Sequence, residues 1–294
     1  MRTNAWPHWG RPVAHAAIVT DASIDLAAET AGDLGIVVAP LGYDIGGKHY
    51  RSGDHSPAQL YAAVSESADA HVEGVAADDL EAAFREAARS CDELICAVHS
   101  VGSSFTRVSA EVAMHRIGAD EATIRLISPG RSTTALAAIC IAGANAAKRG
   151  ANGDEVFRIV EEASTAADAY FIARDLGQLE RSGQLAAVTT QSNVGALDDG
   201  VPLFRVRGRL TAVSVHDSRE EAEAALVEQI AAKAVGRQVI VVSTHAGAAG
   251  DRDRLAALGR TKLQIREEHA TEMGPVVATL LGAGAYGLGF CVAG

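Results

Sequence analysis

The chain has 294 residues, of which 48% are hydrophobic and only 4% aromatic, so it can bury a sizeable core built mainly of alanine, valine, leucine and isoleucine. Its 26 basic and 37 acidic residues give a formal net charge of −11, which argues against the basic face that nucleic-acid binding requires. No apolar run reaches the roughly 18 residues of a membrane span. Residues 1–15 lack the apolar core of a secretory signal. We therefore expect a cytoplasmic protein with a partly ordered tail over residues 1–15.

Apolar runs and helical patterns alternate through the first half of the chain. The runs predict strands over 16–20, 36–41, 94–98 and 124–128. The segments between them predict helices within 21–34, from Ser56-Pro57 to about 65, over 78–90 and over 131–149, with a hairpin around Gly46 and Gly47. This alternation predicts an N-terminal α/β domain over residues 16–167, in which helices cover a mainly parallel sheet.

The second half of the chain has a different pattern. Helices are predicted over 155–167, 175–183, 219–235 and 251–258, and strands over 169–173, 238–243 and 287–292. Alternating apolar residues around Gly208 predict a β-hairpin over 201–215, with three arginines interleaved at 205, 207 and 209. The mixture of hairpin and helices indicates a C-terminal α+β domain over residues 168–294.

A turn rich in hydroxyl groups follows the strand that ends at Val98. It contains Ser100, Gly102, Ser103 and Ser104. A helical pattern begins at once, with Phe105, Val108 and Val112 on one face, and Ser103 or Ser104 is placed to be its N-cap. At such a strand–turn–helix junction, backbone N–H groups and hydroxyls converge on one point that suits a carboxylate or phosphate oxygen. The turn is therefore either a helix cap or an anion site.

Three other patterns bear on chemistry. Residues 282–287 match G-x-G-x-x-G, but a predicted strand follows, so the pattern favours a glycine-rich turn over a dinucleotide site. Asp21 and Asp25 follow the first strand, where they either cap the next helix or bind a ligand. The four cysteines have no paired spacing and no cluster of ligands stands out, so we expect free buried thiols, no metal and no cofactor.

Five segments, taken in order, share their spacing with one known family. Residues 19–26 look like V-T-D-S-S-x-D-L, and residues 36–41 with 47–53 look like I-x-V-V-P-L…G-x-x-Y-x-D-G. Residues 100–110 are similar to S-S-G-L-S-G-T-Y-x-S-A, residues 176–185 to L-x-x-L-x-R-G-G-R-I, and residues 274–284 to G-P-V-I-G-x-H-x-G-P-G. Between about residues 18 and 292 the chain thus resembles the DegV family, bacterial fatty-acid-binding proteins that include the binding subunit of fatty acid kinase.

The resemblance implies two α/β domains with a long apolar tunnel between them and a polar clamp for the carboxylate of a long-chain fatty acid. It also implies a protein without catalytic activity of its own, which presents the acid to a separate fatty acid kinase catalytic subunit. Carried over to this sequence, the ligand-binding residues are Val72, His99, Ser100, Gly102, Ser103, Ser104, Thr106, Leu280 and Gly282.

This sequence departs from the family pattern at the clamp. The clamp threonine falls on Val72, the histidine of the last motif on Leu280, and one serine of the turn on Val101. Residues 214–217 also lack the lysine and arginine of the family. A hydrogen bond to a charged group contributes about 1.5–3 kcal/mol, so these losses would weaken carboxylate binding about 100-fold or more. An apolar tunnel would still contribute about 0.8 kcal/mol per buried methylene.

Four functions are compatible with these residues. The first is a fatty-acid-binding protein, which we favour. The second is a binder of a neutral apolar ligand such as an ester, alcohol or isoprenoid. The third is a hydrolase or acyltransferase that uses Ser100 or Ser104 with His99, although the G-x-S-x-G elbow is absent. The fourth is an interaction protein whose tunnel is closed.

Overall fold

A parallel sheet forms the centre of the first half of the protein. The computed structural model describes residues 16–99, 105–118, 121–191, 194 and 196–294. The sheet has the order β2-β1-β6-β7 and is built of β1 (Ala17–Asp21), β2 (Ile36–Ala39), β6 (Glu93–Ala97) and β7 (Thr123–Ile127). All its strand pairs are parallel. The predicted parallel sheet is therefore confirmed, and β1 lies beside β6 at its centre.

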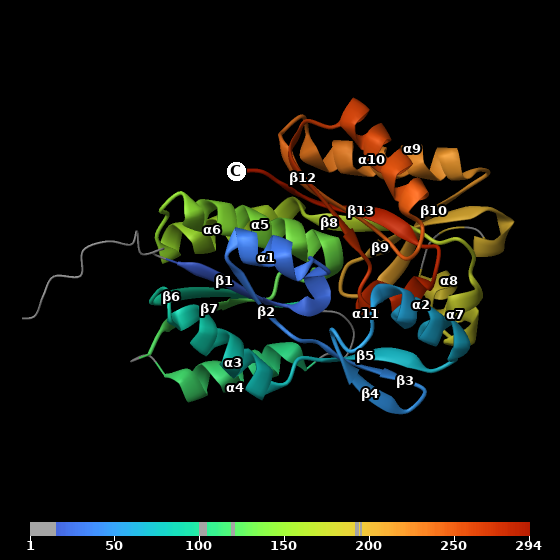
Figure 1. The fold of residues 1–294 in the computed structure, drawn as a ribbon. Helices are drawn as coiled ribbons and strands as arrows, with labels where there is room; N and C mark the ends of the chain where they lie inside the picture. The colour runs from blue at the N-terminus through green and yellow to red at the C-terminus, as the bar shows by residue number, and fades with distance from the viewer. Residues whose placement is uncertain (1–15, 100–104, 119–120, 192–193, 195) are drawn as a thin grey trace, which may run out of the picture.

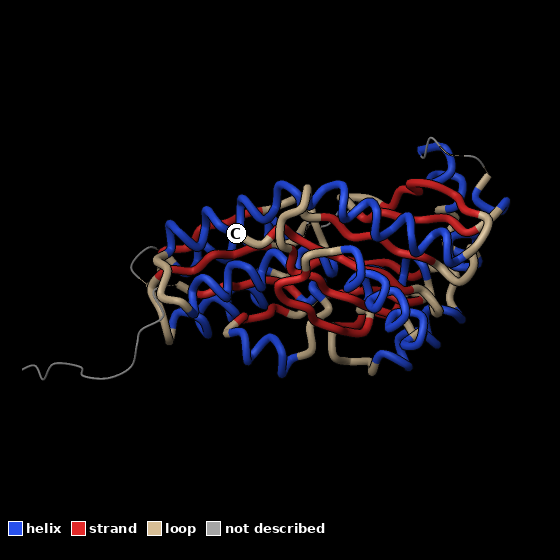
Figure 2. The backbone as a smooth tube through the Cα atoms, turned by 90° about the horizontal axis from the view of Figure 1, so that it is seen from above, coloured by secondary structure: helices blue, strands red, loops and turns tan. Residues whose placement is uncertain are grey.

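Helices cover both faces of this sheet. On one face lie α3 (Ala77–Ala88) and α4 (Thr106–Ile117), and on the other lie α1 (Ala28–Leu34), α5 (Thr133–Lys148) and α6 (Gly153–Ala166). A 3₁₀ turn over Ala22–Ile24 leads from β1 toward α1. Seen from above, helices run over strands along the length of the molecule (Figure 2). This arrangement places the carboxyl ends of β1 and β6 side by side at one edge.

A larger sheet forms the centre of the second half. Its order is β10-β9-β8-β13-β11-β12, with β8 (Asp168–Ile172), β9 (Val201–Val206), β10 (Leu210–His216), β11 (Val239–His245), β12 (Ile265–Glu272) and β13 (Tyr286–Val292). Its strand pairs are antiparallel except β11 with β12. Helices α9 (Arg219–Ala234) and α10 (Ala249–Lys262) cover its outer face. The predicted α+β region with a hairpin is confirmed.

Helix α5 lies between the two sheets (Figure 1). It contacts β1 on one side and β11 and β13 on the other. Almost all of its residues are buried, because its sequence Thr133–Lys148 is alanine-rich and apolar around its whole circumference. The molecule is therefore layered as helices, sheet, helices, sheet and helices. No helix within the described part of the chain combines the length and apolar character needed to cross a bilayer.

A small antiparallel sheet joins the two halves. It has the order β4-β3-β5 and consists of β3 (Gly42–Ile45), β4 (Lys48–Arg51) and β5 (Ala70–Gly74). Next to it lie α2 (Pro57–Glu66), α7 (Gly177–Arg181), α8 (Leu185–Gln191), the 3₁₀ turn Leu197–Asp199 and α11 (Pro275–Leu281). The Tyr61 hydroxyl of α2 donates to the carbonyls of His245 and Met273. Residues 42–74 thus pack against the C-terminal half as well as their own.

Several details differ from the sequence-based expectations. Elements β5, α8, β12 and α11 were not predicted. Helix α4 begins at Thr106 with Phe105 at its N-cap, so the prediction of Ser103 or Ser104 as N-cap is wrong. The apolar face of Phe105, Val108 and Val112 is exposed, because the buried face of α4 consists of the smaller residues Thr106, Ser109, Ala110 and Ala113, with Ile117. All four cysteines are free and buried, as predicted.

The packing of α5 on β13 depends on Gly289. A Cβ atom at this position would overlap the backbone of Thr134 and Ala135 at the start of α5. We expect Gly289→Ala to lower the free energy of unfolding by about 1–3 kcal/mol, as overpacking of a close contact does. Urea denaturation measures this change. As a control, Gly259→Ala in α10 places its Cβ 3.7 Å from Leu288, an ordinary contact, and we expect no loss of stability. Equal stabilities of the two variants would contradict the prediction.

Candidate functional site

A cavity of about 300 Å³ lies among β5, α11 and the turn of the β9–β10 hairpin. It is lined by Ala70, His71, Val72, His99, Gln184, Gly208, Arg209, Leu210, Val276, Thr279 and Leu280. These residues come from both halves of the chain. The volume is at the lower end of the 300–1,000 Å³ typical of small-molecule sites. The cavity is therefore large enough to receive a ligand.

Three of the residues expected to bind a ligand line this cavity together. They are Val72 on β5, His99 after β6 and Leu280 on α11. Val72 and Leu280 are half-buried and His99 is buried. Strand β5 and helix α11 are in contact, which brings Val72 close to the helix that carries Leu280. The structure thus places two apolar side chains and one histidine around the same space.

The other expected residues lie elsewhere. Thr106 is buried in the first turn of α4, where its Oγ1 accepts a hydrogen bond from the Val75 N–H at 3.1 Å. Gly282 ends α11 with a positive φ of 72° and faces Gln178, and it is not among the residues that line the cavity. The remaining four, Ser100, Gly102, Ser103 and Ser104, lie outside the described residues.

His99 forms a buried pair with Asp21. Because β1 and β6 are parallel neighbours with Thr20 opposite Ala97, the residues that follow their carboxyl ends meet. One Asp21 oxygen accepts the backbone N–H of His99 at 2.8 Å, and the other lies 3.1 Å from Nδ1 of the ring. Asp21 also accepts the N–H of Ser23 and so caps the 3₁₀ turn. The first βα turn therefore uses Asp21 both as a cap and as the partner of the cavity histidine.

Each member of the pair stabilises the charged form of the other. Burial lowers the pKa of His99, but the negative charge of Asp21 and its hydrogen bond outweigh burial, so the pKa lies above its ordinary value. Burial raises the pKa of Asp21, but the charge and hydrogen bonds of His99, with the Ser23 hydrogen bond, bring it below its ordinary value. We infer an imidazolium–carboxylate pair next to the cavity.

The pair leaves one donor of His99 for a ligand. Nε2 has no hydrogen-bond partner among the described residues, although the side chain is buried. With Nδ1 directed to Asp21, Nε2–H is the free donor of the ring. A buried donor without a partner costs free energy. The side chain of His99 is fully buried, so a ligand oxygen in the cavity would recover this free energy only after a local movement that brings it to Nε2. The arrangement can therefore bind an acceptor, and most strongly an anionic one.

Polar groups that the sequence analysis did not single out also line the cavity. Arg209 lies in the hairpin turn, lines the cavity and is exposed. Gln184 precedes α8, and Thr279 lies on α11 with its hydroxyl donating to the Pro275 carbonyl. The alternation of arginines in the hairpin was visible in the sequence, but which arginine faces the cavity depends on the packing of that hairpin.

Asp25 lines a second cavity. It adopts a left-handed conformation (φ 57°) after the 3₁₀ turn, and this cavity of about 570 Å³ also includes Tyr43, His55 and Glu272. Both of its carboxyl oxygens are buried without a hydrogen bond from the described residues. Burial raises the pKa of Asp25 well above its ordinary value; the nearby Gly274 N–H opposes this rise and the charge of Asp21 adds to it.

The raised pKa of Asp25 predicts a pH-dependent loss of stability. A folded-state pKa above the unfolded value of about 3.9 means that folding is penalised increasingly as the pH rises from there. Asparagine tolerates the left-handed conformation and carries no charge. We expect Asp25→Asn to gain stability relative to the wild type between pH 4 and pH 8, by about 1 kcal/mol or more. Thermal denaturation across this range measures the difference. The exposed Asp33→Asn is the control and should follow the wild type; parallel curves for Asp25→Asn would contradict the prediction.

Comparison with known sequences places the chain in a family. A sequence model described as uncharacterised proteins of the DegV family matches residues 15–293. The chain belongs to the DegV family. A DegV domain-containing protein of Halalkalibacterium halodurans is 25% identical over 287 residues, which cover 94% of this chain and 98% of that protein. The resemblance found from five motifs is thus confirmed over nearly the whole chain.

Solved structures of DegV proteins have the same fold. A fatty-acid-binding DegV family protein from Thermus thermophilus superposes with a TM-score of 0.79 at 22% identity, covering 95% of this chain and 99% of that chain. DegV from Bacillus subtilis, described as a fatty acid binding protein, gives a TM-score of 0.78 at 21% identity, with 95% and 99% coverage. The similarity establishes the architecture of this DegV protein.

Proposed function

We propose that the protein binds a long-chain fatty acid in the cavity between residues 16–167 and 168–294, and that it acts by binding rather than by catalysis. The observation that carries the proposal is the free Nε2 donor of His99 next to a cavity lined by Val72 and Leu280. The fatty acid binding described for the Thermus thermophilus and Bacillus subtilis relatives supports the same ligand class. The acyl chain would lie against the apolar lining.

The carboxylate site in this proposal is smaller than the clamp that the family resemblance implies. His99 Nε2–H would donate one hydrogen bond, worth about 1.5–3 kcal/mol to a charged acceptor. The hydroxyl turn at Ser100 and Ser104 is the proposed remainder of the site. Thr106, which the resemblance also implies, would support that turn from the start of α4 rather than contact the ligand. Val72 and Leu280 supply apolar surface in place of polar donors. Affinity would then come mainly from the buried methylenes, at about 0.8 kcal/mol each.

Native mass spectrometry of the purified protein tests the proposal. We expect a bound acyl mass that corresponds to a fatty acid, or uptake of added palmitate or oleate by the delipidated protein. Absence of both would overturn the proposal. Recovery of an ester, fatty alcohol or isoprenoid, with no uptake of the acids, would establish the neutral-ligand alternative instead. A protein that takes up no lipid of either kind would fit the interaction protein with a closed tunnel.

A double variant tests the part played by the histidine. Asp21→Asn with His99→Phe removes both charges together, so no unpaired buried ion remains, while the amide oxygen of the introduced asparagine can still accept the backbone N–H of residue 99. Loss of one charged hydrogen bond predicts about 10-fold to 100-fold weaker binding of palmitate. His115→Gln on the exposed face of α4 is the control and should bind as the wild type does. Unchanged affinity in the double variant would remove His99 from the site.

The Asp21–His99 pair also favours a second candidate function. A histidine base that activates a serine needs a carboxylate at Nδ1 and an unprotonated Nε2. His99 has the carboxylate, and Ser100 and Ser104 follow it in the sequence, but its imidazolium would first have to release the Nε2 proton. The second candidate is therefore an acyl hydrolase or acyltransferase. A fluorophosphonate probe that labels the wild type, and not Ser100→Ala or Ser104→Ala, would establish it and contradict the non-catalytic proposal.

The proposal includes a partner. A protein that binds a free fatty acid without reacting with it needs a separate enzyme to consume that acid, and the resemblance implies a fatty acid kinase catalytic subunit. Formation of acyl phosphate when such a subunit is mixed with the loaded protein tests this part. No acyl phosphate with a kinase that accepts other DegV proteins would exclude the partnership.

A further inference from the structure

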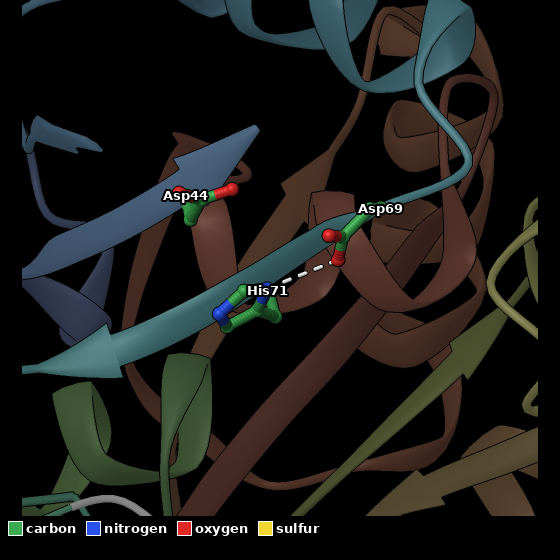
Figure 3. Close-up of side chains that lie close together, drawn as sticks. All are labelled: Asp44, Asp69 and His71. Atoms are coloured by element: carbon green, nitrogen blue, oxygen red, sulfur yellow. Dashed lines mark hydrogen bonds and ion pairs between the residues drawn. The ribbon is translucent and has the colours of Figure 1, made fainter. Parts of the chain in front are cut away.

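One face of the small β4-β3-β5 sheet carries a row of metal-ligating side chains. Asp44 on β3 is directly opposite His49 on β4 and His71 on β5. Residues two apart on a strand share a face, so Glu73 lies on the same face as His71, and Asp69 precedes the strand on that side. Figure 3 shows Asp44 on β3, His71 on β5 and Asp69 just before β5 close together. The strand register thus assembles a cluster that has no recognisable spacing in the sequence.

Asp44 is the buried member of the cluster. Its residue is 3% exposed, and one carboxyl oxygen accepts the Gly47 N–H at 2.9 Å. The other lies 3.5 Å from Nδ1 of His49, and no lysine or arginine of the described residues is within ion-pair distance of it. A buried carboxylate is costly unless a cation or hydrogen-bond donors compensate it. Asp44 therefore has an oxygen available for a cation.

Asp69 and His71 complete a set of three metal-ligating side chains with Asp44. Nδ1 of His71 lies 3.3 Å from a carboxyl oxygen of Asp69. One ligating atom from each of Asp44, Asp69 and His71 lies within 4.8 Å of the other two. Donors 2.0–2.2 Å from a tetrahedral ion are roughly 3.4 Å from one another, so small side-chain movements would bring these three atoms onto one ion. The side chains of His71 and Asp69 are 56% and 74% exposed, so an ion can reach them from solvent.

We propose that Asp44, Asp69 and His71 bind a divalent transition-metal ion of the Zn²⁺ type, with water as the fourth ligand. An imidazole nitrogen with two carboxylates suits Zn²⁺ and similar ions, whereas Ca²⁺ takes six to eight oxygen ligands and Mg²⁺ an octahedron of oxygens. This metal site would bind a cation through an imidazole and two carboxylates, whereas the proposed lipid site would bind an acyl chain and its carboxylate. It nevertheless adjoins the cavity, because Ala70, His71 and Val72 of β5 contribute to the cavity lining.

A second trio on the same face provides a matched comparison. Asp44, His49 and Glu73 also have ligating atoms within 4.8 Å of one another. In this trio, however, Nδ1 of His49 already bonds an oxygen of Glu73 at 2.6 Å. A metal would have to break that hydrogen bond, whereas the contact between His71 and Asp69 is longer, at 3.3 Å. The structure therefore favours His71 over His49 as the nitrogen ligand.

Titration of the full chain with Zn²⁺ alone tests the site. The protein is first stripped with a chelator and then titrated in a calorimeter or against a zinc-binding dye. We expect one saturable site in the wild type. His71→Ala and Asp69→Asn should each weaken it at least tenfold, and His49→Ala, the matched histidine on the opposite side of Asp44, should change it less than threefold. No lipid is needed, so a failure of this test is distinguishable from a failure of the proposed function.

The remaining outcomes each contradict the proposal. Absence of saturable Zn²⁺ binding in the wild type would overturn it, as would wild-type affinity in His71→Ala. Loss of binding in His49→Ala with retention in His71→Ala would assign the ion to the other trio. Circular dichroism and the unfolding midpoint of each metal-free variant confirm that it is folded. Both histidines are more than half exposed, so we expect these variants to fold normally.

Discussion

Replacing Asp21 by asparagine is expected to destabilise the protein by about 3 kcal/mol at pH 7. Breaking a buried ion pair by removing one partner costs about 3–5 kcal/mol, and the side chains of both Asp21 and His99 are fully buried. The lower end of that range applies here, because an unpaired imidazole can lose its proton. Chemical denaturation measures the change. The control is Asp154→Asn, whose side chain is 83% exposed and pairs with Arg125 at the surface; it should cost less than about 1 kcal/mol.

The stability lost in Asp21→Asn should depend on pH, whereas a loss of packing alone would not. The raised pKa of His99 means that its contribution in the wild type is complete below its unfolded value of about 6.5 and is lost as the pH rises through the folded value. The lowered pKa of Asp21 means that its contribution is lost in acid, below about pH 4. The stability difference between wild type and Asp21→Asn should therefore grow as the pH falls from 8 to 5. A difference that does not vary with pH would contradict the ion pair.

Restoring two polar side chains at the cavity is expected to raise fatty acid affinity about 100-fold or more. The variant is Val72→Thr with Leu280→His, which places a hydroxyl and an imidazole where the family resemblance expects them. Both positions line the same cavity as His99, and each new hydrogen bond to the carboxylate would add about 1.5–3 kcal/mol. Displacement of a fluorescent fatty acid by palmitate measures the affinity.

A valine-to-threonine change outside the cavity is the control for the expected gain in palmitate affinity. Val108→Thr on α4 is 60% exposed and does not line the cavity, so palmitate affinity should stay within about twofold of the wild type. A fatty alcohol of the same length should gain little from Val72→Thr with Leu280→His, because it carries no charge for the new donors. Unchanged palmitate affinity in that double variant would show that neither position takes part in carboxylate binding.

The sequence was most informative about strands that are buried on both faces. Ala17–Asp21 and Glu93–Ala97 are nearly continuous apolar runs, because helices cover the parallel sheet on both sides. Ile265–Glu272 was missed because it is an edge strand rich in charged residues, which suit an edge and resemble a loop in sequence. Pro275–Leu281 was missed because its short apolar sequence does not show helical periodicity, although the proline at its start is typical of a helix.

In the candidate site, too, some features could be predicted from the sequence and others depend on the tertiary structure. Val72, His99 and Leu280 could be named from the sequence because each falls on or beside a motif of the family. The partnership of His99 with Asp21 could not, since it depends on β1 and β6 being neighbours, and the order of strands in a sheet is a tertiary property. The cluster of metal-ligating side chains around Asp44 depends in the same way on the register of β3 against β4 and β5.

The position of α5 has a consequence for how the protein unfolds. The helix belongs by sequence to the first half, yet it forms part of the packing of the second through β11 and β13. A fragment that ended at residue 167 would leave one apolar side of α5 in water, and a fragment that began at 168 would lack the cover of its sheet. Unfolding of either half would therefore expose buried apolar side chains of the other half to water. We expect one cooperative transition for the whole chain, with the ligand cavity opening only by local movement of the elements around it.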